Sequence, residues 1–450
     1  MTVTTLTGHR RVAPYGMAGG APGALGRHWV ERADGTVVPM PGCDSVQVAA
    51  GDLFVNETPG GGGYGTPGAG VIQTGSMTTH TAEGAAGAVI AGQRVELLDR
   101  ARVYACGITP YDVTHLGHAA TFVWIDTLGR VLRLLGVQPE VCRNVTDVDD
   151  VLDVAAGRAG ADYDEFAAIQ QFGFDRDMAA IGVRSPEHEP RAHRYVAHVI
   201  RLAAGLIDVG AAYQRTGGVY FRGAGVAERA GLGPAAALAL SGEFGGRPDD
   251  PAKDDPLDVA VWQPAEPGHP AWDSPWGPGR PGWHAECVAM AMSVFGPAVD
   301  VHAGGAELRF PHHAYHAAMA EAFTGVRPYA RAWFHTGVVT IDGAKMAKSA
   351  GNLVMTGDLL ANHPAGAVRL MILDRPWADD WDYGPGLLDA AAVRLEDLYR
   401  AAGRTASGSP DAVTEIRRLL ASDLNVPAAV DLAIEAGGAP ARVLVTTLGL

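Results

Sequence analysis

Two of the chain's three lysines lie three residues apart in one short segment. The segment reads GAKMAKSAGNL over residues 343–353 and holds Lys345 and Lys348, in a chain that has 32 arginines. An ammonium group on a flexible stem can follow a moving phosphate charge, whereas a guanidinium favours a fixed planar partner. A glycine-rich loop with two lysines is therefore suited to stabilising pyrophosphate as it leaves a phosphorus centre. The alternative is a solvated surface loop.

A second polar motif, THLGH, stands between a predicted strand and a predicted helix. His115 and His118 would meet the helix N-terminus there, where free N–H groups and the positive end of the dipole favour phosphate. Two imidazoles at that point can donate hydrogen bonds to phosphate oxygens. Two polar capping residues would give the same pattern, so HxGH alone does not decide between these interpretations.

The cysteines and the clustered histidines could hold a metal ion. Cys106 lies in YACGITPYD, Cys287 in GRPGWHAECVAM, and His312, His313 and His316 in GGAELRFPHHAYH. Two thiolates and one imidazole form a zinc ligand set that leaves a coordination position open. That position could take a substrate thiolate and would discriminate against a hydroxyl. Because no CxxC pair anchors such a site, buried cysteines and surface histidines remain the alternative.

An α/β pattern surrounds these motifs. The apolar run RVYAC leads through THLGH into a helical pattern, AATFVWIDTLGRVLRLLG, and a second strand follows in PEVCRNVTD. This strand–helix–strand order favours a parallel sheet. Residues 155–215 have a mostly helical pattern, and residues 216–280 are rich in Gly, Pro and Asp. AVDVHAG and WFHTGVVTID are strand-like, and 360–450 predicts helices with Ala/Leu faces.

The N-terminal part has a different texture. Short alternating runs (WVER, TVV, SVQVA, LFV) separated by DG, PG and GD predict a small all-β element over residues 1–68. The GGGGYG run is followed by neither a helical pattern nor GK[ST], which favours a plain glycine loop over a phosphate loop. Residues 69–95 are Gly, Ala, Thr and Ser with weak pattern and predict a linker.

Composition limits the class of protein. A length of 450 residues predicts two or three domains, and a formal net charge of −15 argues against gripping a long nucleic acid. The four widely spaced cysteines favour a reducing compartment over a disulfide framework. Neither a signal-peptide core nor an apolar run of about 18 residues occurs, so we expect a cytoplasmic protein.

HLGH and KMAKS together resemble the paired signatures of class I aminoacyl-tRNA synthetases. This resemblance implies activation of a carboxylate by ATP, with Mg²⁺, followed by attack of an acceptor on the adenylate. With Cys106, NVTDVDD, RPGWHAEC and FPHH, residues 96–450 resemble cysteinyl-tRNA synthetases and the related cysteine ligases of mycothiol biosynthesis. The phrases ACGITPYDVTHLGHAATF and SPWGPGRPGWHAEC are more similar to the ligases.

The resemblance also implies a fold and residue roles. The fold would be α/β: a Rossmann-like parallel-sheet core over 96–360 with an insertion around 155–280, and a helical domain over 361–450. The implied cofactor is one zinc ion per chain, with Cys106, Cys287 and His312 as its ligands. The cysteine substrate would contact Cys106, Thr109, Thr146 and Trp283. ATP would be bound by His115, Gly117, His118, Glu307, Lys345 and Lys348, and the two histidines and two lysines would be the catalytic set.

Three positions depart from the family pattern. Ala347 replaces a serine between the lysines, which predicts weaker ordering of that loop while both cations are kept. Glu307 replaces an aspartate, which puts its contact to substrate or ribose in doubt. His316 stands where cysteinyl-tRNA synthetases have a glutamate, four residues after His312 and on the same helix face. It could be a fourth zinc ligand or a histidine on the surface near the site.

The resemblance therefore implies ligation of cysteine to the amine of glucosaminyl-inositol through a cysteinyl-adenylate. The acidic balance and the chain's end after a short helical region predict a small acceptor and no tRNA. Because no apolar run of membrane-spanning length occurs, we expect no membrane partner, and because no pattern indicates a coiled coil or a long apolar edge, we expect a monomer. The alternatives are a cysteinyl-tRNA synthetase, a paralogue serving another amine, and an inactive binding module that kept the fold. His118 and Asp112 are candidates for the general base.

The first part of the chain carries a separate resemblance. GAPGALGRHWVERADGTV and DLFVNETPGGGGYG resemble the C-terminal tail of the hydantoinase B/oxoprolinase family. The resemblance covers only this segment, so none of that family's catalytic machinery is implied. A fused remnant and a gene start placed too early both account for it.

Overall fold

We describe a computed structural model of the chain, which separates into two units, Met1–Glu83 and Gly84–Leu450. The structure describes residues 2–6, 21, 23–41, 43–57, 86–97, 99–111, 114–267, 269–346, 350–405 and 409–450. No helix in these ranges is long and apolar enough to cross a membrane.

The N-terminal unit consists of short antiparallel strands. One pair is formed by β1 (Thr2–Leu6) and β4 (Cys43–Gln47), and β2 (Arg27–Glu31) lies between β3 (Val37–Pro39) and β5 (Leu53–Glu57). Side chains of β2 alternate, with His28 and Val30 buried. The prediction of an all-β element is confirmed, whereas the GGGGYG run lies outside the described residues.

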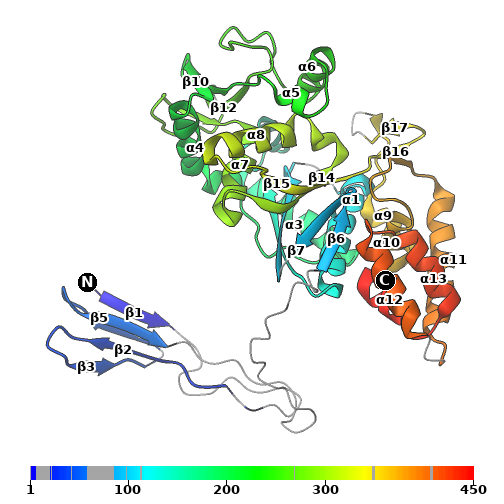
Figure 1. The fold of residues 1–450 in the computed structure, drawn as a ribbon. Coiled ribbons are helices and arrows are strands. Elements are labelled where there is room, and N and C mark those ends of the chain that lie inside the picture. The colour runs from blue at the N-terminus through cyan, green and yellow to red at the C-terminus, as the bar shows by residue number, and fades with distance from the viewer. Residues whose placement is uncertain are drawn as a thin grey trace. The chain divides into compact units, whose positions relative to one another are not determined.

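A four-stranded parallel sheet forms the centre of the second unit (Figure 1). Its order is β15-β14-β8-β9, with bounds Ala330–Thr336, Val299–Gly305, Arg100–Ile108 and Gln138–Val145. Helix α1 (Leu116–Leu134) connects β8 to β9, as the strand–helix–strand pattern predicted. Every residue of β14 is buried, which is typical of a central parallel strand.

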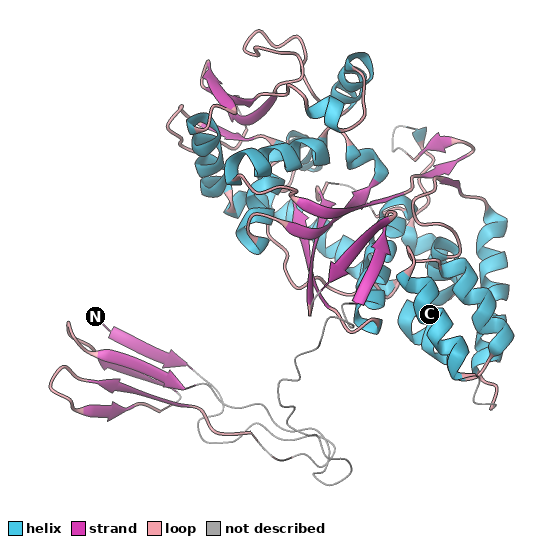
Figure 2. Cartoon of the chain, viewed as in Figure 1, coloured by secondary structure: helices cyan, strands magenta, loops and turns pink. Residues whose placement is uncertain are grey.

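Between β9 and β14 the chain adds helices and a small antiparallel sheet. The helices are α2 (Asp150–Ala159), α3 (Tyr163–Ala180), α4 (Val196–Asp208), α5 (Val226–Arg229) and α6 (Pro234–Glu243). The sheet has the order β10-β11-β12-β13, with bounds Ala212–Arg215, Gly218–Phe221, Val259–Pro264 and Gly279–Pro281. The Gly/Pro/Asp-rich stretch is therefore partly a sheet, because its short apolar runs pair with one another (Figure 2).

Two helices and a short three-stranded sheet surround the carboxyl ends of β14 and β15. Helix α7 (Trp283–Phe295) precedes β14, and α8 (His312–Thr324) follows it after a 3₁₀ turn, Ala306–Arg309. Strand β16 (Val339–Ile341) pairs with β17 (Ala344–Lys345) and, in parallel, with β18 (Trp381–Asp382). Through this sheet, the strand that contains Lys345 is connected to β18, which precedes helix α11 of the C-terminal region.

The C-terminal part is a helical bundle, as its Ala/Leu pattern predicted (Figure 1). Four of its helices have proline in the first turn, where the missing N–H costs nothing. The helices are α9 (Thr356–Asn362), α10 (Ala365–Leu373), α11 (Pro385–Ala402), α12 (Pro410–Ala421), α13 (Val426–Ala436) and α14 (Ala439–Leu448).

The predicted linker 69–95 ends too late. Strands β6 (Ala86–Ile90) and β7 (Gln93–Leu97) form a hairpin that packs in the second unit, where Ile90 and Leu97 are buried. The Asp423 carboxylate accepts hydrogen bonds from the N–H groups of the hairpin turn at Ala91 and Gly92. Short strands of Gly, Ala and only a few branched residues give a weak sequence pattern, so their partners decide their structure.

A buried ion pair joins helix α1, which connects two strands of the parallel sheet, to the C-terminal helical bundle. Arg369 on α10 is fully buried, and its Nη2 lies 2.8 Å from Asp126 Oδ2 on α1. The guanidinium also donates to the carbonyls of Ile181 and Leu448. Arg130 Nε donates to the same carboxylate at 2.7 Å. We call Asp126, Arg130 and Arg369 the carboxylate–arginine cluster.

Candidate active site

A cavity of about 380 Å³ opens at the carboxyl ends of the parallel strands, where α/β proteins bind ligands. It is bordered by the end of β8, the turn after β14 and the segment after β15. Eight of the residues predicted for the site line it: Cys106, Thr109, His115, Gly117, His118, Trp283, Glu307 and Lys345. The fold thus brings both sequence signatures and the proposed cysteine pocket to one place.

The HLGH motif starts helix α1. His115 is the N-cap, and its Nδ1 accepts a hydrogen bond from the Gly117 N–H at 3.1 Å. A Cβ on Gly117 would lie 2.9 Å from His115 Cε1, so glycine is needed for this cap. The His118 ring packs 4.0 Å from the His115 ring, centroid to centroid. His115 therefore caps the helix and lines the cavity at the same time, so the two interpretations of HxGH are compatible.

The lysine segment is held close to this helix start. The Leu116 N–H donates to the Val354 carbonyl at 2.8 Å, and the Thr356 N–H donates to the Thr114 carbonyl at 3.3 Å. Lys345 is exposed, with its Nζ 5.9 Å from the centre of the Phe244 ring. Ala347, Lys348 and the base candidate Asp112 lie outside the described residues.

The three predicted zinc ligands converge below the cavity. The ligand atoms of Cys106, Cys287 and His312 all lie within 4.8 Å of one another, and all three residues are buried. His312 Nε2 is 3.2 Å from Cys287 Sγ. Two sulfurs and one imidazole nitrogen, with Cys106 also lining the cavity, suit zinc with a position open toward substrate. The donor set therefore fits the metal that the sequence predicted.

His312 is held in an orientation suited to a ligand. Its Nδ1 lies 2.8 Å from His284 Nδ1, one nitrogen donating to the other, which leaves Nε2 facing Cys287. The Trp283 ring stacks on His312 at 4.1 Å. Burial opposes ionisation of Cys287, but the hydrogen bond with Cys106 and the charge of His312 lower the pKa of its thiol to about 5. A thiolate is the form that binds a metal.

The threonine pair predicted for the cysteine pocket is also assembled. Thr109 Oγ1 and Thr146 Oγ1 are 2.7 Å apart, with Thr109 lining the cavity and Thr146 donating to the Ile108 carbonyl at 3.2 Å. Asn144 was not predicted, although it lies in the quoted NVTD segment. Its Nδ2 donates to Cys287 Sγ at 3.3 Å, and its Oδ1 accepts from the Gly107 N–H at 2.9 Å.

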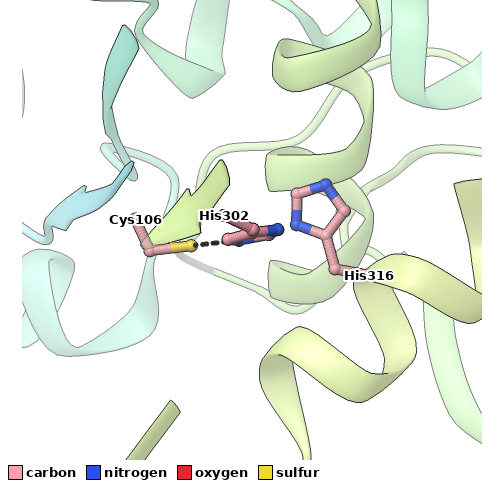
Figure 3. Close-up of side chains that lie close together, drawn as sticks. All are labelled: Cys106, His302 and His316. Atoms are coloured by element: carbon pink, nitrogen blue, oxygen red, sulfur yellow. Dashed lines mark hydrogen bonds between the residues drawn. The ribbon is translucent and has the colours of Figure 1, made fainter. Parts of the chain in front are cut away.

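His316 lies beside the predicted ligand set and is grouped with only one of its members, Cys106. Its ligand atom lies within 4.8 Å of those of Cys106 and His302, in a group separate from Cys287 and His312. Figure 3 shows these three side chains converging from β8, β14 and α8. His302 was missed because VDVHAGG reads as a buried strand. His316 is fully buried, so the surface interpretation of this residue is wrong.

Comparison with known proteins identifies the family of the chain. Residues 94–393 match the model of the class I tRNA synthetase (C) catalytic domain. The chain belongs to this family. The membership makes it an ATP-dependent ligase by class. Residues 1–67 match hydantoinase B/oxoprolinase, in agreement with the resemblance of the N-terminal unit.

Relatives within the family carry a more specific name. An L-cysteine:1D-myo-inositol 2-amino-2-deoxy-alpha-D-glucopyranoside ligase of Frankia casuarinae is 43% identical over 337 residues, which cover 73% of this chain and 72% of that protein. The ligase of the same name from Mycobacterium marinum is 44% identical over 341 residues, covering 73% and 82%.

Solved structures agree with the family in fold. Mycobacterium tuberculosis methionyl-tRNA synthetase in complex with methionyl-adenylate aligns with a TM-score of 0.53 at 16% identity, over 78% of this chain and 82% of that one. The ternary complex of Agrobacterium radiobacter K84 agnB2 LeuRS with tRNA and LeuAMS aligns with a TM-score of 0.54 at 11% identity, over 77% and 83%. The class I synthetase fold that the sequence predicted is confirmed.

Proposed function

We propose that this chain ligates L-cysteine to the amine of 1D-myo-inositol 2-amino-2-deoxy-alpha-D-glucopyranoside through a cysteinyl-adenylate. The observation that carries the proposal is the identity of 42–44% to ligases of that name over about three quarters of the chain. The cavity supports it, because it combines a nucleotide-binding helix start with a thiol-selective ligand set.

In the first step the cysteine carboxylate attacks the α-phosphorus of ATP, and pyrophosphate leaves. The start of α1, with His115 and His118, would hold the phosphates by N–H donation. Lys345, and Lys348 from the segment outside the described residues, would stabilise the negative charge on the leaving group, with Mg²⁺ on ATP. Glu307 lines the same cavity and would contact the nucleotide or substrate.

Substrate selection rests on the thiol end of the cavity. A zinc ion held by Cys106, Cys287 and His312 would bind the cysteine sulfur as a thiolate, which serine cannot match. Thr109, which lines the cavity, would contact the substrate, and Thr146 would fix the orientation of the Thr109 hydroxyl. The Trp283 ring covers His312 and borders the same space.

In the second step the deprotonated acceptor amine attacks the acyl carbon, AMP leaves and an amide forms. We propose an adjoining cavity of about 770 Å³ as the acceptor's site, because Phe244 and Glu307 line both cavities. Its lining includes the carboxylates of Glu243 and Asp379 and the guanidinium of Arg309. Such groups recognise an aminated polyol by charge and by hydrogen bonds to hydroxyls.

The main alternatives share the first step and differ in the acceptor. A cysteinyl-tRNA synthetase would transfer cysteine to tRNA, and a paralogue would use another amine. The net charge of −15 and the relatives' name favour a small acceptor and a chain that binds no tRNA. The proposal includes a monomer, because no pattern in the sequence predicts a coiled coil. Among the residues that the structure describes, the free cysteines Cys106, Cys142 and Cys287 suit a reducing cytoplasm.

A product assay tests the proposal. Purified protein receives ATP and cysteine with glucosaminyl-inositol in one tube and with tRNA in another, and products are read by mass spectrometry. We expect the amide in the first tube and uncharged tRNA in the second. Charged tRNA alone would return the chain to the synthetases. AMP release without either product would identify a paralogue with another acceptor.

The acceptor site has its own test. Glu243→Gln with Asp379→Asn should raise the acceptor KM about tenfold while cysteine-dependent ATP–pyrophosphate exchange stays unchanged. The matched control is Glu396→Gln, an exposed carboxylate on α11 away from both cavities. An equal fall in exchange and amide formation would show that the two carboxylates act on the fold instead.

A further inference from the structure

Phe244 lies where three cavities meet. It borders the catalytic cavity of about 380 Å³, the proposed acceptor cavity of about 770 Å³ and a third space of about 120 Å³ that Trp283 and His284 also line. Its side chain is partly buried, so the ring belongs neither to the core nor to the open surface. An apolar ring in this place separates the space for the activated cysteine from the space for the acceptor.

The end of helix α6 holds the backbone of Phe244 in place. The Gly246 N–H donates to the Ser241 carbonyl at 2.8 Å. The Gly245 N–H donates to the Gly242 carbonyl at 3.3 Å, and Gly245 has a φ of +80°. These two bonds form a Schellman ending, which a glycine in the left-handed conformation permits. A Cβ on Gly246 would lie 2.3 Å from Ser241 Oγ, so the second glycine is needed as well. The sequence SGEFGG therefore presents the Phe244 side chain from a hydrogen-bonded turn.

Contacts of the Phe244 ring place it against both ends of the catalytic cavity. It stacks on the Trp283 ring with centroids 6.5 Å apart and planes inclined by 25°, and Trp283 in turn stacks on His312. The Nζ of Lys345 is 5.9 Å from the centre of the Phe244 ring, within the range of a cation–π contact. The ring is therefore in contact with the thiol end of the cavity and with the lysine that would stabilise pyrophosphate.

A cysteinyl-adenylate needs protection from water at this boundary. The intermediate is a mixed anhydride, and a water oxygen can attack its acyl carbon. The bond from that carbon to the phosphate oxygen then breaks, AMP leaves with the bonding electrons, the attacking water loses a proton and free cysteine forms. The acceptor cavity is large enough to hold many water molecules when no acceptor is bound. Exclusion of water from a reactive intermediate is one of the tasks of an active-site wall.

We propose that Phe244 is a specificity-determining residue that decides whether the activated cysteine is transferred or hydrolysed. Its ring has no hydrogen-bond donor or acceptor, so it does not orient a neighbouring water molecule for attack on the acyl carbon. An acceptor that fills the larger cavity displaces this water and brings its amine within reach of Glu243, the residue before Phe244. The proposal rests on the proposed function, because the intermediate and the acceptor cavity belong to it.

The partition of the intermediate between transfer and hydrolysis tests the proposal. In the full-length protein, AMP release from ATP and cysteine is measured with and without glucosaminyl-inositol, together with cysteine-dependent ATP–pyrophosphate exchange. Phe244→Ala should raise acceptor-independent AMP release about tenfold and leave exchange within about twofold. Phe244→Tyr keeps the ring and should behave like the unsubstituted protein. Phe172→Ala is the matched control, because this side chain on α3 is 71% exposed and borders none of the three cavities.

Unchanged AMP release in Phe244→Ala would overturn the proposal. A parallel fall of exchange and AMP release in this variant, with both restored in Phe244→Tyr, would overturn it too, because the ring would then hold cysteine or ATP. The proposed function fails separately. If AMP release rises as expected but the unsubstituted protein forms no amide with glucosaminyl-inositol, the acceptor assignment is wrong and the role of Phe244 stands. Absence of exchange in the unsubstituted protein would overturn both.

A measurement on the unsubstituted protein covers the case in which Phe244→Ala does not fold. Without acceptor, its AMP release should be about 100-fold slower than its exchange, because the shielded adenylate returns to ATP far more often than water reaches it. Phe244→Leu, a smaller change, should fall between the unsubstituted protein and Phe244→Ala. AMP release that keeps pace with exchange in the unsubstituted protein would show an unshielded intermediate and overturn the proposal.

Discussion

Two buried polar clusters in the catalytic unit differ in how their atoms are paired. In the carboxylate–arginine cluster, Asp126 accepts from Arg130 and Arg369, and the remaining donors of Arg369 reach backbone carbonyls. In the group of Cys106, His302 and His316, buried nitrogens have no partner among the described residues. A closed network has no capacity left for a ligand, whereas an open one does.

This difference distinguishes buried polar groups that stabilise the fold from buried polar groups that can bind a ligand. Burying an unpaired polar atom costs about 1–3 kcal/mol, so a fold keeps several such atoms together only when something else compensates. The carboxylate–arginine cluster ties α1 to α10 and the chain's last helix. The histidines instead surround the sulfur that borders the catalytic cavity. We expect mutation of the first cluster to affect stability and mutation of the second to affect metal and activity.

The largest effect is expected where the two ligand groups overlap. Cys106→Ser should remove bound zinc and lower cysteine-dependent ATP–pyrophosphate exchange about 1,000-fold, because serine is a poor zinc ligand. Zinc content and exchange rate are the measurements. Cys142→Ser is the matched control, since this buried cysteine on β9 belongs to neither ligand group. A Cys106→Ser protein with full zinc content would show that Cys106 is not required for zinc binding.

Breaking the closed cluster should cost stability instead. Arg369→Leu leaves Asp126 with Arg130 as its ion-pair partner and should lower the free energy of unfolding by about 3–5 kcal/mol. Urea unfolding measures the loss, and zinc per chain should be unchanged in the folded protein. Arg418→Leu, at an exposed pair on α12, serves as control and should change little. Unchanged stability in Arg369→Leu would contradict a structural role.

The sequence predicted the parts of the site that local patterns encode. An apolar strand, a polar loop and a long amphipathic helix placed His115 and His118 at a helix start, and this arrangement is found. The hairpin of β6 and β7 was missed because its few apolar residues acquire meaning only against distant partners. His302 and Arg369 were missed for the same reason. Each looks like an isolated polar residue in an apolar run. His302 lies 196 residues from Cys106 in sequence, and Arg369 lies 243 residues from Asp126.

Mutation of Lys345 tests the cavity separately from the two buried clusters, because this lysine is exposed and belongs to neither cluster. Lys345→Ala should lower kcat for adenylate formation about 100-fold with little change in stability, since its charge is needed only as pyrophosphate leaves. Lys253→Ala, at the remaining lysine, is the control. Exchange kinetics separate kcat from the ATP KM, and a rise in KM alone would show that Lys345 binds ATP without assisting the departure of pyrophosphate.

Acidic pH should reduce the stability that the buried neutral histidines contribute and leave the carboxylate–arginine cluster intact. Burial, reinforced by Arg309, lowers the pKa of His335 to about 4, from about 6.5 in an unfolded chain. The native state therefore keeps this imidazole neutral, and the unfolded state binds its proton first as the pH falls. Stability is fully present above about pH 6.5 and is lost as the pH falls toward 4, by about 2 kcal/mol between pH 7.5 and 5.

His335→Asn tests this assignment. His313, whose Nδ1 is 2.8 Å from His335 Nε2, and His302 are the other titrating groups nearby, and burial lowers the pKa of both. The variant should therefore flatten the pH dependence of urea unfolding without abolishing it. An unchanged slope between pH 7.5 and 5 would show that His335 is not neutral in the native state.

The smallest effect is expected at the contact between His284 and His312. His284 Nδ1 shares a hydrogen bond with His312 Nδ1, and this contact would hold the His312 ring in its orientation toward the metal. His284→Asn should weaken zinc affinity roughly tenfold, measured by competition with a chelator, because His312 remains in place but is less firmly oriented. His188→Asn, in a partly exposed pair with Glu140, is the matched control. If the His284 variant loses zinc completely, the orientation of His312 depends on this contact far more than a second-shell role allows, and His284 itself becomes a candidate ligand.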